Sequence, residues 1–291
     1  MIWLEYLLPL IFLAPLGATA LVVLGLRHLL QRRLRSPLTG RLLRESSQSL
    51  RDRLDRAQTM LFLNGALGPI AAMAPLVYGM GRMLLAHEQN WLEWACYGLL
   101  STLAVFVFCG LLINTVARIR RLKFGLACDL AVAQKITDLI HPEAHPYFVF
   151  HDVPGDGFNI DHIAITPHGV FAIVTKARTR PLDVAPDHPV VVDGERLRFP
   201  HCEENVLLRR TRVISRWLSG YLEQHCGSLI PVCGVLVLPG WDVQITKMPE
   251  GLLVISGDAL VAEIERHRFA TLDAATRAQA MRLIARRIDD H

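Results

Sequence analysis

The stretch 161-DHIAITPHGVFAIVTKA-177 decides how the soluble part of this chain folds. Two short runs rich in β-branched and apolar residues flank Pro167, His168 and Gly169, which is the pattern of a β-hairpin. At the open end of the hairpin one arm begins with Asp161 and the other ends with Lys176. An acid and a base at the open end of an otherwise apolar hairpin raise the question of whether they have a function there.

The turn residues predict which side chains meet. If the two loop residues are His168 and Gly169, Asp161 lies directly opposite Lys176. Opposite residues project from the same face, with Cβ atoms about 5 Å apart. Val174 lies on that face too, one step diagonal to Asp161. The sequence therefore predicts that an acid, a lysine and position 174 converge at one place.

A carboxylate and a lysine held this close suit hydrolysis of phosphodiesters. The carboxylate of Asp161 is a ligand for Mg²⁺, a hard cation that prefers oxygen. The metal and the Lys176 ammonium group together polarise water and stabilise charge at phosphorus. The alternative is an exposed ion pair at a strand end, which contributes about 0–1 kcal/mol.

Three runs without Asp, Glu, Lys or Arg occupy the first part of the chain, at about 6–26, 57–81 and 94–117. A helix needs about 20 apolar residues to cross a membrane, so we expect three transmembrane helices. Glu5 stands where a signal peptide has basic residues, which favours an uncleaved anchor over a leader.

The basic residues predict the orientation of these helices. The loop 27–56 carries nine arginines, whereas the connection 82–93 carries one. The positive-inside rule then places the loop and residues 119–291 in the cytoplasm and the N-terminus outside. We therefore divide the chain into a membrane region, 1–118, and a cytoplasmic domain. This is a multi-pass protein of a bacterial-type cytoplasmic (inner) membrane, with a basic loop that contacts membrane lipids.

The cytoplasmic part reads as an α/β domain with a mixed sheet flanked by helices. Val232–Leu238 is fully apolar, which predicts a central strand covered on both faces. In chain order the expected elements are a helix (125–140), strands (147–153, 160–166, 170–175), a hairpin (190–199), a helix (202–224), strands (232–238, 252–255) and two helices (258–266 and after 271).

Charge and cysteine content narrow the functional classes. Residues 118–291 contain 21 Lys and Arg against 21 Asp and Glu, so the domain has no overall basic charge. Its cysteines face a reducing cytosol, which disfavours disulfides. Two His-Cys pairs, 201–202 and 225–226, lack the ligand spacing of a zinc site, so zinc is not expected.

Residues 125 to about 260 resemble the nuclease-related domain family, called NERD, in three pieces. Residues 125–129 (GLACD) resemble a G-x-x-G-E helix, residues 159–163 (NIDHI) an N-I-D-H strand, and residues 166–176 (TPHGVFAIVTK) the run T-P-x-G-V-F-V-I-E-T-K. The resemblance implies a restriction-endonuclease-like fold with a D…E-x-K site. Asp161 would then be the metal ligand and Lys176 the electrostatic stabiliser, while Val174 replaces the family's glutamate.

Because Val174 cannot bind a metal, other residues must supply the missing metal ligand. Asp129 and the backbone carbonyl of Thr175 are accessory candidates, and Glu204 is a candidate for a migrated acid. The cofactor implied is Mg²⁺ or Mn²⁺. Phosphate contacts are expected from arginines near the site: Arg178, Arg180, Arg209 and Arg212.

Two functions remain open on the sequence. The first is a membrane-anchored, metal-dependent nuclease that acts on DNA or RNA at the cytoplasmic face. The second is a catalytically impaired relative that binds nucleic acid or a protein partner, or senses it, at the membrane. The retained Asp161 and Lys176 favour the first, and Val174 favours the second.

Overall fold

The computed structural model describes residues 48–86, 91–137, 139, 147–181, 183–185 and 188–290. The chain divides into two compact units. One is helical and includes Asp52–Leu122, and the other is an α/β unit that includes Lys123–His291 and takes in residues 48–51. The first predicted membrane span, 6–26, lies outside the described residues, as does most of the loop 27–56.

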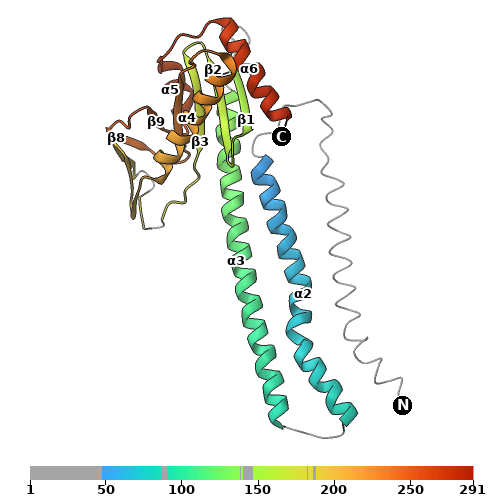
Figure 1. Cartoon of the computed structure of the whole chain (residues 1–291). Helices are drawn as coiled ribbons and strands as arrows, with labels where there is room; N and C mark the ends of the chain where they lie inside the picture. The colour runs from blue at the N-terminus through green and yellow to red at the C-terminus, as the bar shows by residue number, and fades with distance from the viewer. Residues whose placement is uncertain are drawn as a thin grey trace. The chain divides into compact units, whose positions relative to one another are not determined.

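Two long helices, α2 (Gln48–Ala86) and α3 (Trp91–Thr137), account for the described part of the helical unit (Figure 1). Each contains a stretch long and apolar enough to cross a membrane, and almost none of it is buried. These stretches correspond to the second and third predicted spans. The helices approach closely where a Cβ at Gly68 would collide with the ring of Phe108, as small residues allow between membrane helices.

The helix α3 is longer than expected. The sequence predicted a span that ends at residue 117 and a separate helix that begins at Gly125. Instead one helix continues to Thr137. Residues 118–124 contain neither glycine nor proline, so nothing in the intervening segment breaks the helix.

A five-stranded mixed sheet forms the centre of the α/β unit, with the strand order β1-β2-β3-β7-β9. Strands β1, β2 and β3 are antiparallel neighbours, and β3, β7 and β9 are parallel. The strands are β1 (Phe148–Pro154), β2 (Asn159–Thr166), β3 (Gly169–Thr175), β7 (Val232–Leu238) and β9 (Leu252–Ser256). The prediction of an interior position for β7 is confirmed.

Helices cover both faces of this sheet. On one face pack α4 (Val206–Cys226) and α6 (Ala274–Asp289), against Ala172 and Val174 of β3 among others. The other face is covered by the end of α3 and by α5 (Leu260–Arg266), against Phe171 and Ile173 among others. The alternation along β3 therefore sends successive side chains into two separate cores.

A second, four-stranded sheet has the order β6-β5-β4-β8. Its predicted part is the hairpin of β4 (Val190–Asp193) and β5 (Arg196–Phe199). The strands β6 (Cys202–Glu204) and β8 (Val243–Lys247) were not predicted. The helix expected over 202–224 begins only at Val206, because its first residues pair with β5 instead. The α/β class is thus confirmed, and the restriction-endonuclease-like fold remains a prediction.

Candidate functional site

Asp161 and Lys176 lie at the same edge of the five-stranded sheet, because β2 begins where the antiparallel β3 ends. The carboxyl ends of the parallel strands β3 and β7 meet at this edge. Beyond β7 the chain continues there into Pro239–Trp241. Open α/β sheets bind ligands beyond the carboxyl ends of their parallel strands, so this edge is the place to look for a site.

The turn of the β2–β3 hairpin uses two other loop residues than the expected His168 and Gly169. Thr166 pairs with Gly169, so the loop consists of Pro167 and His168. The hydroxyl of Thr166 closes this loop, since its Oγ1 accepts from the N–H of His168 and donates to the carbonyl of Gly169, both at 3.0 Å. The side chain of Thr166 therefore draws Gly169 into the strand.

This turn changes which residue faces Asp161. The β2–β3 ladder ends with His162 opposite Ile173. This register, extended by one residue, puts Val174 opposite Asp161, and it differs from the register that was predicted to put Lys176 there. Lys176 is one step further on, at a diagonal spacing of about 7–8 Å. The shift is by two residues and strands alternate with a period of two, so all three positions still share a face.

The carboxylate of Asp161 is partly buried and is held by the backbone of β3. Its Oδ2 accepts a hydrogen bond from the N–H of Thr175 at 2.7 Å. Burial, and then the negative charge of Asp129, raise the pKa of Asp161 to about 6. The charges of His162 and Arg210 and the Thr175 hydrogen bond oppose this rise. A carboxyl group with this pKa exchanges its proton close to neutral pH.

Lys176 is exposed at the end of β3. Its backbone N–H donates to the carbonyl of Val237 at 3.0 Å, which ties the end of β3 to β7. Within the described residues its ammonium group forms no ion pair. Lys176 therefore presents a free cation beside Asp161, on the side of the sheet that α4 covers.

Asp129, the accessory candidate, bonds on the other face of the sheet. Its Oδ1 lies 3.1 Å from Nε2 of His162, which is fully buried. Nδ1 of His162 lies 2.8 Å from Nδ1 of His151 on β1. A buried chain of three side chains thus links α3 to β2 and β1, and we call it the Asp129–His162–His151 chain.

The two imidazole rings must carry complementary protons. If Nε2 of His162 donates to Asp129, its Nδ1 accepts, and Nδ1 of His151 carries the shared proton. Burial, and then the charge of His162, lower the pKa of His151 to about 4, although Asp129 opposes this. His162 was predicted to face away from Asp161, and the structure agrees. The participation of His151 was not predicted, because no pattern in the sequence links it to His162.

Glu204 and Arg178 bind each other. Nη1 of Arg178 donates to Oε2 of Glu204 at 2.7 Å, and its guanidinium group lies over the ring of Phe199, 4.3 Å from the centroid. The second oxygen of Glu204 is buried and makes no hydrogen bond within the described part of the chain. Both side chains thus connect β6 and β5 to the segment after β3.

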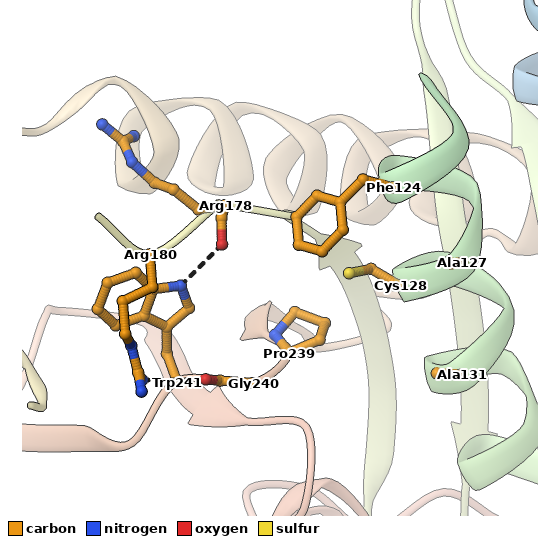
Figure 2. Close-up of a pocket in the computed structure, with 9 residues that line it drawn as sticks. All are labelled: Phe124, Ala127, Cys128, Ala131, Arg178, Arg180, Pro239, Gly240 and Trp241. Carbon is orange, nitrogen blue, oxygen red and sulfur yellow. Dashed lines mark hydrogen bonds between the residues drawn. The ribbon is translucent and has the colours of Figure 1, made fainter. Parts of the chain in front are cut away.

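A cavity of about 400 Å³ lies beyond Lys176, between the end of α3 and the segments after β3 and β7. Figure 2 shows the guanidinium group of Arg178 turned away from Phe124 and Cys128, which lie on α3. The Arg180 guanidinium group lies over the ring of Trp241, 4.6 Å from its centroid, and the Trp241 indole donates to the carbonyl of Arg178 at 3.0 Å. The cavity is therefore mainly apolar.

The predicted phosphate-binding arginines on α4 fall into two groups. Arg212 forms a double hydrogen bond with Glu195, at 2.6 Å for each. Arg209 and its neighbour Arg210 are exposed, and their guanidinium groups make no hydrogen bond or ion pair with any described residue. Arg210 acts on the pKa of Asp161 and so lies near it. Helical periodicity alone could not show which arginine faces the site.

These residues do not fit a resident magnesium ion. Val174 faces Asp161 with an apolar side chain that is 8% exposed. The carboxylate of Asp129 faces His162, with its Oδ1 3.1 Å from Nε2 of that ring. No group of three or more His, Cys, Asp or Glu side chains that could hold a metal occurs among the described residues. One carboxylate, Asp161, and the Thr175 carbonyl at the end of β3 would remain as protein ligands.

Comparison with known protein families finds one similarity, and it lies within the α/β unit. Residues 125–239 match the family model of the nuclease-related domain. This segment of the chain is similar to a NERD domain. The match runs from the last turns of α3 to the residue after β7, and it includes the β2–β3 hairpin and the strands β4, β5 and β6 of the second sheet. There is no significant match to a curated protein or to a solved structure.

Proposed function

We propose that this protein is a membrane-anchored NERD protein that binds nucleic acid at the cytoplasmic face of the membrane. The observation that carries the proposal is the chemistry around Asp161. Lys176 and Arg210 present unpaired cations there, whereas the position expected to supply a second acid is the buried Val174. Such an edge attracts phosphates but lacks ligands that would hold a metal.

Within this proposal Asp161 has a defined role. Its carboxyl group, with a pKa of about 6, is largely ionised at neutral pH. Its negative charge therefore repels phosphates that approach the neighbouring cations. Binding is expected to strengthen as the pH falls through 6, since the protonated group no longer repels a phosphate.

Metal-dependent cleavage of DNA or RNA is the second candidate function. It is favoured by the retention of Asp161 and Lys176 at one edge and by the electrostatic influence of Asp129 on Asp161. The NERD match supports nuclease-related chemistry. The position of Asp129 against His162 and the apolar Val174 speak for binding over cleavage.

The test uses the full-length protein in lipid nanodiscs. Binding of labelled DNA and RNA is measured by fluorescence anisotropy at about 50 and about 200 mM salt. We expect binding that weakens with salt and with Lys176→Gln, but not with Lys247→Gln, which removes an exposed lysine of β8. A wild-type protein that binds neither nucleic acid at low salt would overturn the proposal.

The same samples separate the two candidates. Incubation with plasmid DNA and RNA in the presence of Mg²⁺ or Mn²⁺ shows whether cleavage occurs. Cleavage that disappears in both Asp161→Ala and Lys176→Ala establishes the second candidate. Binding without cleavage, or cleavage unaffected by both changes, removes these residues from any catalytic role.

A further inference from the structure

A groove of about 460 Å³ lies on the α4 side of the sheet, between the loop before β2 and the first half of α4. The residues that line it include Phe158, Val206, Arg209, Arg210 and Val213. We call it the α4 groove. It is separate from the cavity of Figure 2, whose lining includes Arg178 and Arg180.

The α4 groove combines exposed apolar side chains with unpaired cations. Val206 is 65% exposed and Val213 is 55% exposed, although neighbouring α4 residues such as Leu208 and Ile214 are in the core. Positions 206, 209, 210 and 213 are spaced to lie along one face of a helix. More than half of each valine side chain stays outside the core, so this face suits a ligand with an apolar surface.

The guanidinium groups of this face are free for a ligand. Arg212, on the same helix, is bonded to Glu195, but the guanidinium groups of Arg209 and Arg210 have no hydrogen bond or ion pair within the described residues. The charge of Arg210 lowers the pKa of Asp161. Gly157 and Phe158, which line the groove, directly precede β2, and Asp161 is the third residue of that strand. The groove therefore lies next to the end of the sheet that carries Asp161.

The start of α4 adds to the positive potential. Asn205, the N-cap residue, makes no side-chain capping bond, and the first turn has no acidic residue. The first N–H groups of a helix and its dipole favour an anion at this end. The helix end thus adds to the attraction that the two arginines exert on an anion, but by itself it would not identify a binding site.

We infer that the α4 groove binds a single-stranded segment of nucleic acid and leads it to Asp161. Arg209 and Arg210 contact successive phosphates, and the bases rest against Val206, Val213 and the edge of Phe158. Single strands expose base faces that apolar side chains can cover, whereas a duplex hides them. This inference rests on the proposed function, since it names the substrate class and its path at the same edge.

The test compares two double variants of the full-length protein in nanodiscs. Arg209→Gln/Arg210→Gln removes the groove cations. Arg216→Gln/Arg282→Gln removes two exposed, unpaired arginines of α4 and α6 and so matches the change in net charge. Circular dichroism checks that both remain folded.

We expect the groove variant to bind a single-stranded oligonucleotide about tenfold more weakly, with a salt slope reduced by about 1.4 for two phosphates. The control is expected to change little. Wild-type protein is expected to prefer the single strand over its duplex, and a strand with abasic sites is expected to bind more weakly than the intact strand.

Three results overturn the inference. They are equal losses in the two double variants, unchanged binding by the groove variant, or a preference for the duplex. These failures are distinct from failure of the proposed function, in which wild-type protein binds no nucleic acid of either form.

Discussion

Asn159, Asp161 and His162 are polar residues in an otherwise apolar strand, and each bonds to a different element. The amide of Asn159 donates to Asp152 of β1 at 2.8 Å. Asp161 accepts from the backbone of β3, and His162 bonds to Asp129 of α3. Asp152 itself adopts φ +49°, which few non-glycine residues do. At the scale of residues, the segment 159–162 is therefore a junction that holds β1, β3 and α3 around one strand.

Replacement of Asp161 by Asn tests the electrostatics of this junction. Folding raises the pKa of Asp161 to about 6, so the folded state binds the proton more tightly than the unfolded state. Stability from this group is thus present at acid pH and is lost as the pH rises from about 4 to about 6. Asp161→Asn should stabilise the protein by about 1–3 kcal/mol at pH 7.5 and by little at pH 4.

Hydrogen exchange of peptides from β2 and β3 measures this difference at the two pH values. The low pKa of His151 acts in the opposite direction, since it destabilises the fold as the pH falls. This effect of His151 is the same in the wild-type protein and in the Asp161→Asn variant, so it cancels when the two are compared. An equal effect of the substitution at both pH values would show that Asp161 is not shifted by burial.

Replacement of Val174 by Glu tests what the missing acid means. The new carboxylate would lie directly opposite Asp161. Without metal we expect a lower Tm, because two acids then face each other in a largely buried place. Millimolar Mg²⁺ should raise the Tm by a few degrees, since two carboxylates form a better site than one.

Val174→Gln is the matched control, as it has the same shape without the charge. It should lose stability without gaining a response to Mg²⁺. If Val174→Glu responds no more to Mg²⁺ than the control does, position 174 is not the reason for a poor metal site.

At the scale of elements, the β2–β3 hairpin is held by the segment that follows α5. The N–H of Leu272 donates to the carbonyl of Pro167, and that of Ala270 to the carbonyl of His168. Phe269 packs against the turn, and its ring is 5.2 Å from that of Phe171. These contacts lie far apart in sequence, and they fasten the turn that sets the register at Asp161.

Gly169→Ala should loosen this turn. Gly169 has φ +131°, and a Cβ there would lie 2.2 Å from the ring of Phe269. We expect a loss of about 1–3 kcal/mol from backbone strain, and a further loss from displacement of the ring. Hydrogen exchange of the β2–β3 peptides measures the sum.

Phe269→Ala supplies the control, because in that background a Cβ at position 169 meets no ring and Gly169→Ala costs the backbone strain alone. The difference between the losses in the two backgrounds isolates the contact with Phe269. Equal losses would show that this ring has no part in holding the hairpin.

At the scale of the whole molecule, the apolar stretches of α2 and α3 and the α/β unit serve different solvents. The exposed side chains of these helices are largely apolar, and the structure buries almost none of each candidate span. The α/β unit, by contrast, has two buried cores of its own. The described helices of the first unit are thus long and apolar enough to cross a membrane, whereas the second unit buries its own apolar side chains.

The orientation is tested by fusions after His291. Positive charge at 118–123 predicts that the α/β unit is cytoplasmic. A C-terminal green fluorescent protein should therefore fluoresce, and a C-terminal alkaline phosphatase should be inactive in the same host. The reverse pattern would place the domain outside, away from nucleic acid, and would contradict the proposed function as well.

Much of this architecture follows from local patterns. The lengths of the apolar runs in α2 and α3, the alternation in β2 and β3, and the apolar composition of β7 depend on nearby residues only. The strands β6 and β8 carry no such pattern. They are short and exposed, and they form because the β4–β5 hairpin offers them partners.

By itself the sequence determined which face of the sheet Asp161, Val174 and Lys176 share, because strand alternation has a period of two and survives a shift of two residues. Only the tertiary structure decided that Val174 is opposite Asp161, since the Thr166 hydroxyl and the Phe269 ring set the turn. It also decided that Asp129 binds His162 and that Arg210 lies near Asp161. Such pairings join residues that lie far apart in the chain. Packing selects these partners, because the local preferences of the backbone do not reach that far.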